Sequence, residues 1–144
     1  MKLSTKCRYG LRALIEIAKN SGKGPAKRKD IASSQEISDP YLESILLTLK
    51  QSRIINTTRG AKGGYVLCRP AAQITVLDVV NAFEGPLTLV DCLQSPNMCS
   101  KVTFCVTRTI WRELQDTWRS ILEGTTLQDL LDKEHKQQAL TYAI

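Results

Sequence analysis

The chain has 144 residues, of which 42% are hydrophobic and 24% are charged. These proportions are ordinary for a globular protein, and the length suffices for one large domain or for a small domain with an appendage. No apolar run approaches the roughly 20 residues that cross a bilayer, and the first residues lack the apolar core of a signal peptide. We therefore expect a cytoplasmic protein with no membrane partner.

The excess of positive charge lies in the first half of the chain. Residues 1–72 carry fourteen Lys and Arg against five Asp and Glu, whereas residues 73–144 carry six against nine, within a net charge of +6. A basic half indicates a phosphate-binding surface, although a solvated basic surface is the plain alternative. An enzyme is not expected, because the single histidine, His135, lies in a polar stretch and is predicted to be solvated.

Three helices are predicted at the start of the chain, over residues 5–20, 27–33 and 40–52. Apolar residues recur at helical spacing in these segments. The third helix has the best start signal, because Asp39 can cap the exposed amides and Pro40 suits the first helical position. Its polar residues face away from its apolar stripe, which predicts a helix-turn-helix.

A β-hairpin is predicted directly after these helices, over residues 53–69. Two runs, 53–58 and 65–68, flank the glycine-rich turn RGAKGG. Arg59 and Lys62 make this tip basic, and neither a helix nor a GK[ST] sequence follows that would make the glycines a nucleotide site. A hairpin after a helix-turn-helix predicts a winged helix. We therefore expect a mainly α fold with a small β-hairpin.

The rest of the chain is predicted to hold a cysteine-bearing loop and a long amphipathic helix. The expected units are a winged helix-turn-helix domain (1–83), the cysteine loop (84–104), a dimerisation helix with a short C-terminal helix (105–136), and a frayed tail (137–144). The long helix carries both tryptophans among its apolar residues. That is more apolar surface than a small winged domain needs to cover, so we predict a homodimer, with packing onto its own domain as the alternative.

Three cysteines lie within fourteen residues: Cys92, Cys99 and Cys105. Clustered thiolates in a reducing cytoplasm suit a soft metal or an iron–sulfur cluster better than a disulfide framework. The trio lacks a CxxC pair, so it is neither a ferredoxin run nor a common zinc knuckle. Zinc, thiol oxidation and inert cysteines are the alternatives. Cys68, in the second wing strand, is predicted to lie in the core.

Several stretches together resemble the Rrf family of winged-helix regulators, the IscR- and NsrR-like proteins that bind iron–sulfur clusters. They are MKLSTKCRYGLRAL, ISDPYLESILLTLKQSRIINTTRGAKGGYVL, and the three cysteines followed by TRTIWRELQD. The resemblance runs over residues 1–135, and its specific parts are the wing pattern RGxxGGYxL and the x6 and x5 spacing of the cysteines. It implies a homodimeric transcription regulator, expected to be a repressor, that binds a palindromic operator in double-stranded DNA and carries a [2Fe–2S] or [4Fe–4S] cluster.

The resemblance also implies roles for particular residues. The cluster ligands map onto the three clustered cysteines, and the DNA-reading residues map onto Tyr41, Glu43, Ser44 and the wing-tip Arg59. Pro40 stands where the IscR-like members have a serine, so no hydroxyl contact is expected there. On chemical grounds Glu43 can accept from a cytosine amino group, and Arg59 suits a narrow minor groove. The residues predicted to contact phosphates are Lys6, Arg8, Arg28, Lys29, Lys50 and Lys62.

The fourth cluster ligand is left open by the sequence. Family members use a histidine three residues after the last cysteine, where this chain has Arg108, or an aspartate near the start of the first helix, where it has Arg8. Arginine has no lone pair to donate. Cys7 of the partner subunit, Asp91 and a small exogenous ligand are the candidates. For Cys7 a buried core position is the alternative.

We expect the cluster to lie between the cysteine loop of one subunit and the first helix of the other. Redox state, nitric oxide or iron–sulfur status would then set the spacing of the two recognition helices, and with it the operator affinity. The alternative is a cluster-free regulator of the same fold that responds through zinc, thiol oxidation or a partner protein. An RNA-binding protein or a cluster carrier is a more distant alternative.

Overall fold

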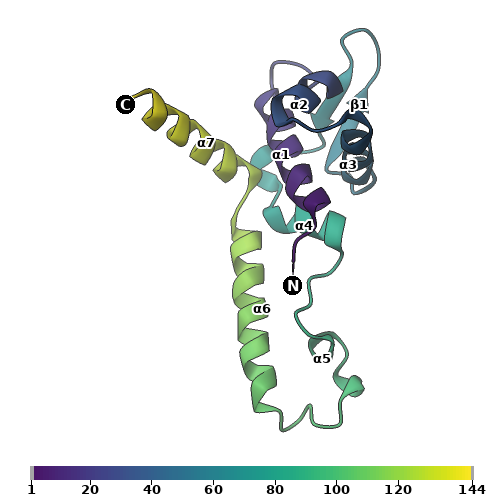
Figure 1. Cartoon of the computed structure of the whole chain (residues 1–144), viewed down its shortest axis with the longest axis vertical. Helices are drawn as coiled ribbons and strands as arrows, with labels where there is room; N and C mark the ends of the chain where they lie inside the picture. The colour runs from purple at the N-terminus through teal and green to yellow at the C-terminus, as the bar shows by residue number, and fades with distance from the viewer. Residues whose placement is uncertain (1, 144) are drawn as a thin grey trace.

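The computed structural model describes residues 2–143, and it is mainly helical with one two-stranded hairpin, as predicted. Figure 1 shows a helical body at one end of the long axis and an arm, built from α6 and the cysteine loop, that extends away from it. In chain order the elements are α1 (Thr5–Lys19), α2 (Arg28–Gln35), α3 (Asp39–Gln51), β1 (Ile55–Thr58), β2 (Gly64–Leu67), η1 (Ala71–Gln73), α4 (Val76–Glu84), α5 (Asp91–Gln94), η2 (Pro96–Met98), α6 (Val106–Gly124) and α7 (Leu127–Tyr142).

The helical body is held together by apolar side chains of α1, α3 and α4. The predicted stripe of α3 is buried in full, and it packs against residues of α1 spaced by three and four. Burying side chains of this size contributes about 1.5–3 kcal/mol each relative to exposure. The residues that form the centre of this core are Leu14, Ile17, Leu42, Ile45, Leu46 and Leu49.

The start of α3 differs in detail from its prediction. The cap position is occupied by Ser38, and Asp39 is already the first helical residue, with Pro40 next to it. The prediction that Asp39 caps the helix is therefore wrong. Its carboxylate instead pairs with the guanidinium of Arg28, at 3.1 Å between Oδ1 and Nε. A tight turn precedes α3, because Glu36 ends α2 with a left-handed φ of 53°.

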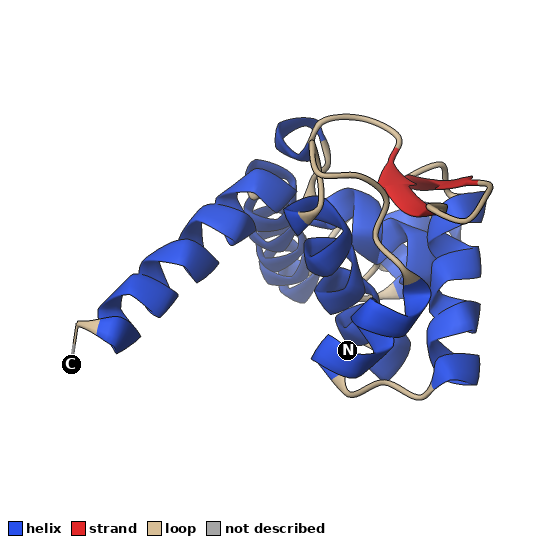
Figure 2. Ribbon diagram, turned by 90° about the horizontal axis from the view of Figure 1, so that it is seen from above, coloured by secondary structure: helices blue, strands red, loops and turns tan. Residues whose placement is uncertain are grey.

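The hairpin pairs β1 and β2 in antiparallel register, from Ile55 opposite Leu67 to Thr58 opposite Gly64. A short bridge anchors it to the body, because Ala26 and Tyr65 exchange two main-chain hydrogen bonds of 2.9 and 2.8 Å. Figure 2 shows the hairpin at one edge of the helical body, away from the end of α7. The wing is thus fixed at its base and free at its tip.

The C-terminal helix α7 returns to the body. Thr126 and Asp129 form a capping box at its start, and Leu127 is buried next to the core. The Nζ atom of Lys19 on α1 lies 2.9 Å from Oε1 of Glu134 on α7. The helix continues to Tyr142, where the sequence predicts a frayed tail after residue 136. No helix within residues 2–143 is long and apolar enough to cross a membrane.

Candidate nucleic-acid interface and cysteine loop

The N-terminal half of α3 carries the predicted base-reading residues. Glu43 is exposed, whereas Tyr41 and Ser44 are half-buried. The hydroxyl of Ser44 donates to the carbonyl oxygen of Tyr41 at 2.9 Å, so the Ser44 oxygen can still accept hydrogen bonds but has no proton left to donate. Glu43 is therefore the side chain of the three that is most accessible to a base edge.

Tyr41 has a packing role. Its ring meets that of Tyr9 on α1 edge to face, with centroids 6.1 Å apart and planes at 89°. The guanidinium of Arg12 lies 4.9 Å from the centre of the Tyr9 ring on the same helix. The contact between Tyr9 and Tyr41 packs α3 against α1. The prediction that Tyr41 also reads DNA stays a prediction.

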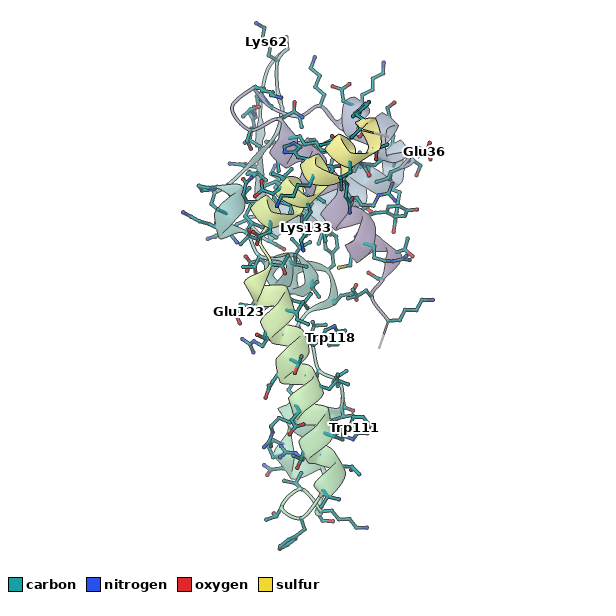
Figure 3. All side chains as sticks on the ribbon, turned by 90° about the vertical axis from the view of Figure 1, so that its left-hand side faces the viewer. Glu36, Lys62, Trp111, Trp118, Glu123 and Lys133 are labelled. Atoms are coloured by element: carbon teal, nitrogen blue, oxygen red, sulfur yellow. The ribbon has the colours of Figure 1, made fainter. Side chains whose placement is uncertain are left out.

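The wing tip is basic and exposed. Arg59 and Lys62 are both exposed, and Figure 3 shows Lys62 at the far end of the hairpin. Gly60 adopts a φ of 107°, and its carbonyl accepts from the amide of Gly63 at 2.9 Å. Position 60 suits glycine because residues with a side chain rarely adopt this backbone conformation. The tight turn presents both cations beyond the end of the strands.

The other predicted phosphate contacts are unequal in availability. Lys29 and Lys50 are exposed and Lys6 is half-buried. The guanidinium of Arg8 donates to the hydroxyl of Thr5 at 3.1 Å, within the first turn of α1. Arg28 differs from all of these, because it already pairs with carboxylates of α3.

The three clustered cysteines lie on separate short elements. Cys92 is in α5, Cys99 directly follows η2, and Cys105 occupies the cap position of α6. Cys99 is exposed and the other two are half-buried. Within residues 2–143, no three Cys, His, Asp or Glu side chains converge on a point that could hold a metal ion. The structure thus places the predicted ligands in one loop without gathering them.

Cys105 has a hydrogen-bonding environment that stabilises its thiolate. Its Sγ lies 3.2 Å from the hydroxyl of Thr107. That contact, followed by the main-chain amides of Arg108 and Thr107 and the charge of Arg108, lowers the pKa of Cys105 below its ordinary value despite some desolvation. The lowered pKa makes the thiolate, the form that binds soft metals, easier to form at the start of α6.

Arg108, which stands where family members supply a histidine ligand, has a structural role here. Its Nη2 and Nε atoms donate to the carbonyl oxygen of Cys92, at 3.1 and 3.3 Å. The side chain therefore joins the first turn of α6 to α5. Sequence reasoning missed this contact, because the sequence does not show which carbonyl the guanidinium will meet.

Cys7 does not fit the role of a fourth ligand. Its side chain is only 3% exposed within the helical body. Burial, and then the charge of Glu84, raises the pKa of Cys7 to about 11. A protonated thiol turned into its own domain is a poor ligand for a group bound by a partner's loop. The structure favours the core alternative for this residue.

Two other sequence predictions have clear outcomes. Cys68 was predicted to be a core residue, and that is wrong: it is exposed, because β2 ends at Leu67 and Cys68 follows the strand. His135 is exposed on α7, as predicted.

The comparisons with known proteins decide the family. A family model described as Rrf2, an iron-dependent transcriptional regulator, matches residues 3–133. This chain belongs to the Rrf2 family of transcriptional regulators. The regulator CymR of Bacillus subtilis is 36% identical over 145 residues, and the alignment spans the whole length of both chains. Protein rrf2 of Nitratidesulfovibrio vulgaris is 41% identical over 131 residues, 91% of this chain and 87% of its own.

Solved Rrf2-family structures match the fold as well. The structure of B. subtilis CymR, described as the global cysteine regulator, matches with a TM-score of 0.79 at 36% identity. The match covers 92% of this chain and 98% of the CymR chain. The structure of T. potens IscR has a TM-score of 0.78 at 33% identity, covering 96% of this chain and 91% of that one. The predicted winged-helix fold and a non-enzymatic regulatory role are thereby confirmed. The family model is described as iron-dependent, whereas CymR is described as a cysteine regulator. Membership of the family therefore does not identify the signal to which this chain responds.

Proposed function

We propose that this Rrf2-family chain is a homodimeric repressor in the cytoplasm that reads a palindromic operator in double-stranded DNA. The observation that carries the proposal is that α3 and the basic wing lie at the same end of the molecule, with Glu43, Arg59 and Lys62 exposed. The recognition helix of a winged helix enters the major groove with its N-terminal residues at the base edges. The wing then follows the adjacent backbone and minor groove.

Each side chain has a defined part in this interface. The carboxylate of Glu43 accepts from a cytosine amino group, and the oxygen of Ser44 accepts through its free lone pairs. Arg59 enters a narrow minor groove, where the negative potential is strongest. Lys29, Lys50 and Lys62 contact phosphates, so they set affinity and salt dependence rather than sequence choice.

The homodimer is proposed to form along α6. None of the residues 106–124 is buried in the single chain, although Ile110, Trp111 and Leu114 lie among them. Trp111 and Trp118 lie along one side of the helix (Figure 3). An exposed apolar stripe of this length is typical of an interface, and a second copy of the same stripe covers it symmetrically.

The signal is proposed to enter at the cysteine loop. Cys92, Cys99 and Cys105 supply the soft donors that an iron–sulfur cluster takes, so the donor chemistry fits even though the structure does not gather the three. When bound, such a group supplies a centre that reacts with oxidants and nitric oxide. Cys105 contributes its thiolate at the start of α6. Asp91 or a small exogenous ligand completes the site.

The loop is proposed to influence the DNA end through α6 and its contacts. Figure 1 shows the cysteine loop and the wing at opposite ends of the long axis. Arg108 ties α5 to the first turn of α6, and the side-chain oxygen of Gln115 accepts from the amide of Leu89 at 3.0 Å. A shift of the loop therefore moves α6, and with it the distance between two recognition helices. A coupling of about 1–3 kcal/mol would make a useful switch.

The DNA part of the proposal is tested by selecting binding sites from a random duplex library with the purified full chain. We expect a palindrome whose half-sites are one helical turn, or a multiple of it, apart. Glu43→Ala should relax one base position, and Arg59→Ala should weaken sites with a narrow minor groove. Selection of no preferred sequence, or of RNA over duplex DNA, would overturn the proposal.

A second candidate keeps the fold and DNA binding but has no cluster. It would respond through thiol oxidation, zinc or a partner protein. The lowered pKa of Cys105 favours it, as does the similarity to CymR, described in B. subtilis as the global cysteine regulator. Staphylococcus aureus CymR has a solved oxidized form. Protein isolated without air separates the candidates, because the cluster-free form is colourless and lacks iron and sulfide.

A further inference from the structure

Two carboxylates project from the end of α3 that is proposed to face DNA. Asp39 and Glu43 are four residues apart, so they lie on one face of the helix. Their side chains are 55% and 66% exposed. Two negative charges at this position repel the phosphates of the duplex, so the interface needs a cation that neutralises them.

Arg28, the first residue of α2, meets both carboxylates. Its Nε atom lies 3.1 Å from Oδ1 of Asp39, and its Nη1 atom lies 3.8 Å from Oε1 of Glu43. One planar guanidinium presents several N–H groups in a fixed fork, so it can face two carboxylates at once. The contact joins the first helix of the helix-turn-helix to the base-reading end of the second.

We propose that Arg28 is a positioning residue that holds Glu43 for base reading, and not an independent phosphate contact. This inference rests on the proposed function, in which Glu43 reads a base. In free protein the pair is exposed and contributes little to stability. Against DNA, where water is excluded, the same contact is stronger and restricts Glu43 to one orientation. Specificity at one base position therefore depends on a side chain that does not touch that base.

A double-mutant cycle on the full-length protein tests the proposal, with Arg28→Ala, Glu43→Ala and the double variant. The probe is the duplex operator that wild-type protein selects from a random library, together with its single-base variants at every position. We expect Arg28→Ala to weaken operator binding about tenfold and to relax preference at the base position that Glu43→Ala also relaxes. In the Glu43→Ala background, removal of Arg28 should have little further effect on preference.

Two further variants keep the test decisive. Arg28→Lys retains the charge without the fork, so it should keep the salt dependence of binding while still relaxing the base preference. Lys62→Ala, at the wing tip, serves as the phosphate-contact control: it should weaken all sequences equally, reduce the slope of affinity against salt, and add to Glu43→Ala. Thermal melts should be unchanged for Arg28→Ala, because the pair is exposed.

The contrary outcomes are distinct. If Arg28→Ala behaves like Lys62→Ala, weakening all sequences equally and additively with Glu43→Ala, then Arg28 is a phosphate contact and the inference is wrong. Unchanged binding and preference in Arg28→Ala would also overturn it. If Glu43→Ala itself leaves sequence preference unchanged, the base-reading part of the proposed function fails instead.

Discussion

Arg108 donates two hydrogen bonds to the carbonyl oxygen of Cys92, across sixteen residues of chain. The contact closes the cysteine loop onto the first turn of α6. It connects the segment where the signal is proposed to enter with the helix along which the dimer is proposed to form.

Arg108→Ala should loosen the loop locally. Hydrogen bonds from a charged donor contribute roughly 1.5–3 kcal/mol when shielded, and about 1 kcal/mol is a fair expectation at this half-exposed site. Hydrogen exchange at the amides of Leu93 and Ser95 should accelerate about fivefold, which corresponds to that loss. Exchange in the core helix α3 should stay unchanged, and unaltered exchange in the loop would show that the contact does not hold it.

Leu114→Glu should break the dimer. Its side chain is 51% exposed on the apolar stripe of α6, so a charge there would be buried without a partner in the interface. Sedimentation should then show a monomer. A thermal melt should show an unchanged melting temperature for the helical body. Arg112→Glu places the same side chain on the opposite face of the helix and should leave the dimer intact. A dimer that survives Leu114→Glu would remove α6 as the interface.

Cys7 predicts a pH dependence of stability. The pKa of Cys7 rises from 9.0 to about 11 on folding, so the folded state favours the neutral thiol. The resulting stabilisation is fully present below pH 9 and is lost as pH rises through 11. Between pH 8 and 11, reduced wild-type protein should lose about 2 kcal/mol more unfolding free energy than Cys7→Ala. Urea titrations at both pH values measure this difference, and parallel curves would contradict the burial of the thiol.

Gly64→Ala should destabilise the base of the wing. A Cβ atom at Gly64 would collide with the carbonyl oxygen of Ala26, where the hairpin is bridged to the body. We expect a loss of about 1–3 kcal/mol in unfolding free energy, with weaker operator binding. Gly124→Ala is the matched control, since a Cβ there meets open space in helix α6 and should stabilise by about 0.5–1 kcal/mol. Equal melting temperatures for wild type and Gly64→Ala would contradict the close approach.

Most of the fold was accessible from the sequence because local signals agreed with one another. Apolar periodicity located α1, α3 and α6, and the glycine-rich turn located the hairpin. The predictions that were wrong concern residues whose role depends on contacts between distant parts of the chain. Asp39 looks like a cap in sequence, but in three dimensions Arg28 attracts its carboxylate.

The candidate sites were predicted less completely. The identity of Glu43 and of the three loop cysteines follows from pattern and resemblance. Which carbonyl Arg108 meets, and that Arg28 faces two carboxylates, depends on how α2, α5 and α6 are placed in space. Burial of Cys7 was one of two interpretations of its helical stripe, and only the packed body selects between them.

The central claim is that the cysteine loop holds an iron–sulfur cluster. It is tested most directly by measuring iron and acid-labile sulfide in full-length protein isolated without air, alongside single alanine variants. We predict a coloured wild-type protein with iron and sulfide in equal amounts, loss of both in Cys92→Ala, Cys99→Ala and Cys105→Ala, and retention in Cys7→Ala. A colourless wild-type protein without iron and sulfide would contradict the account.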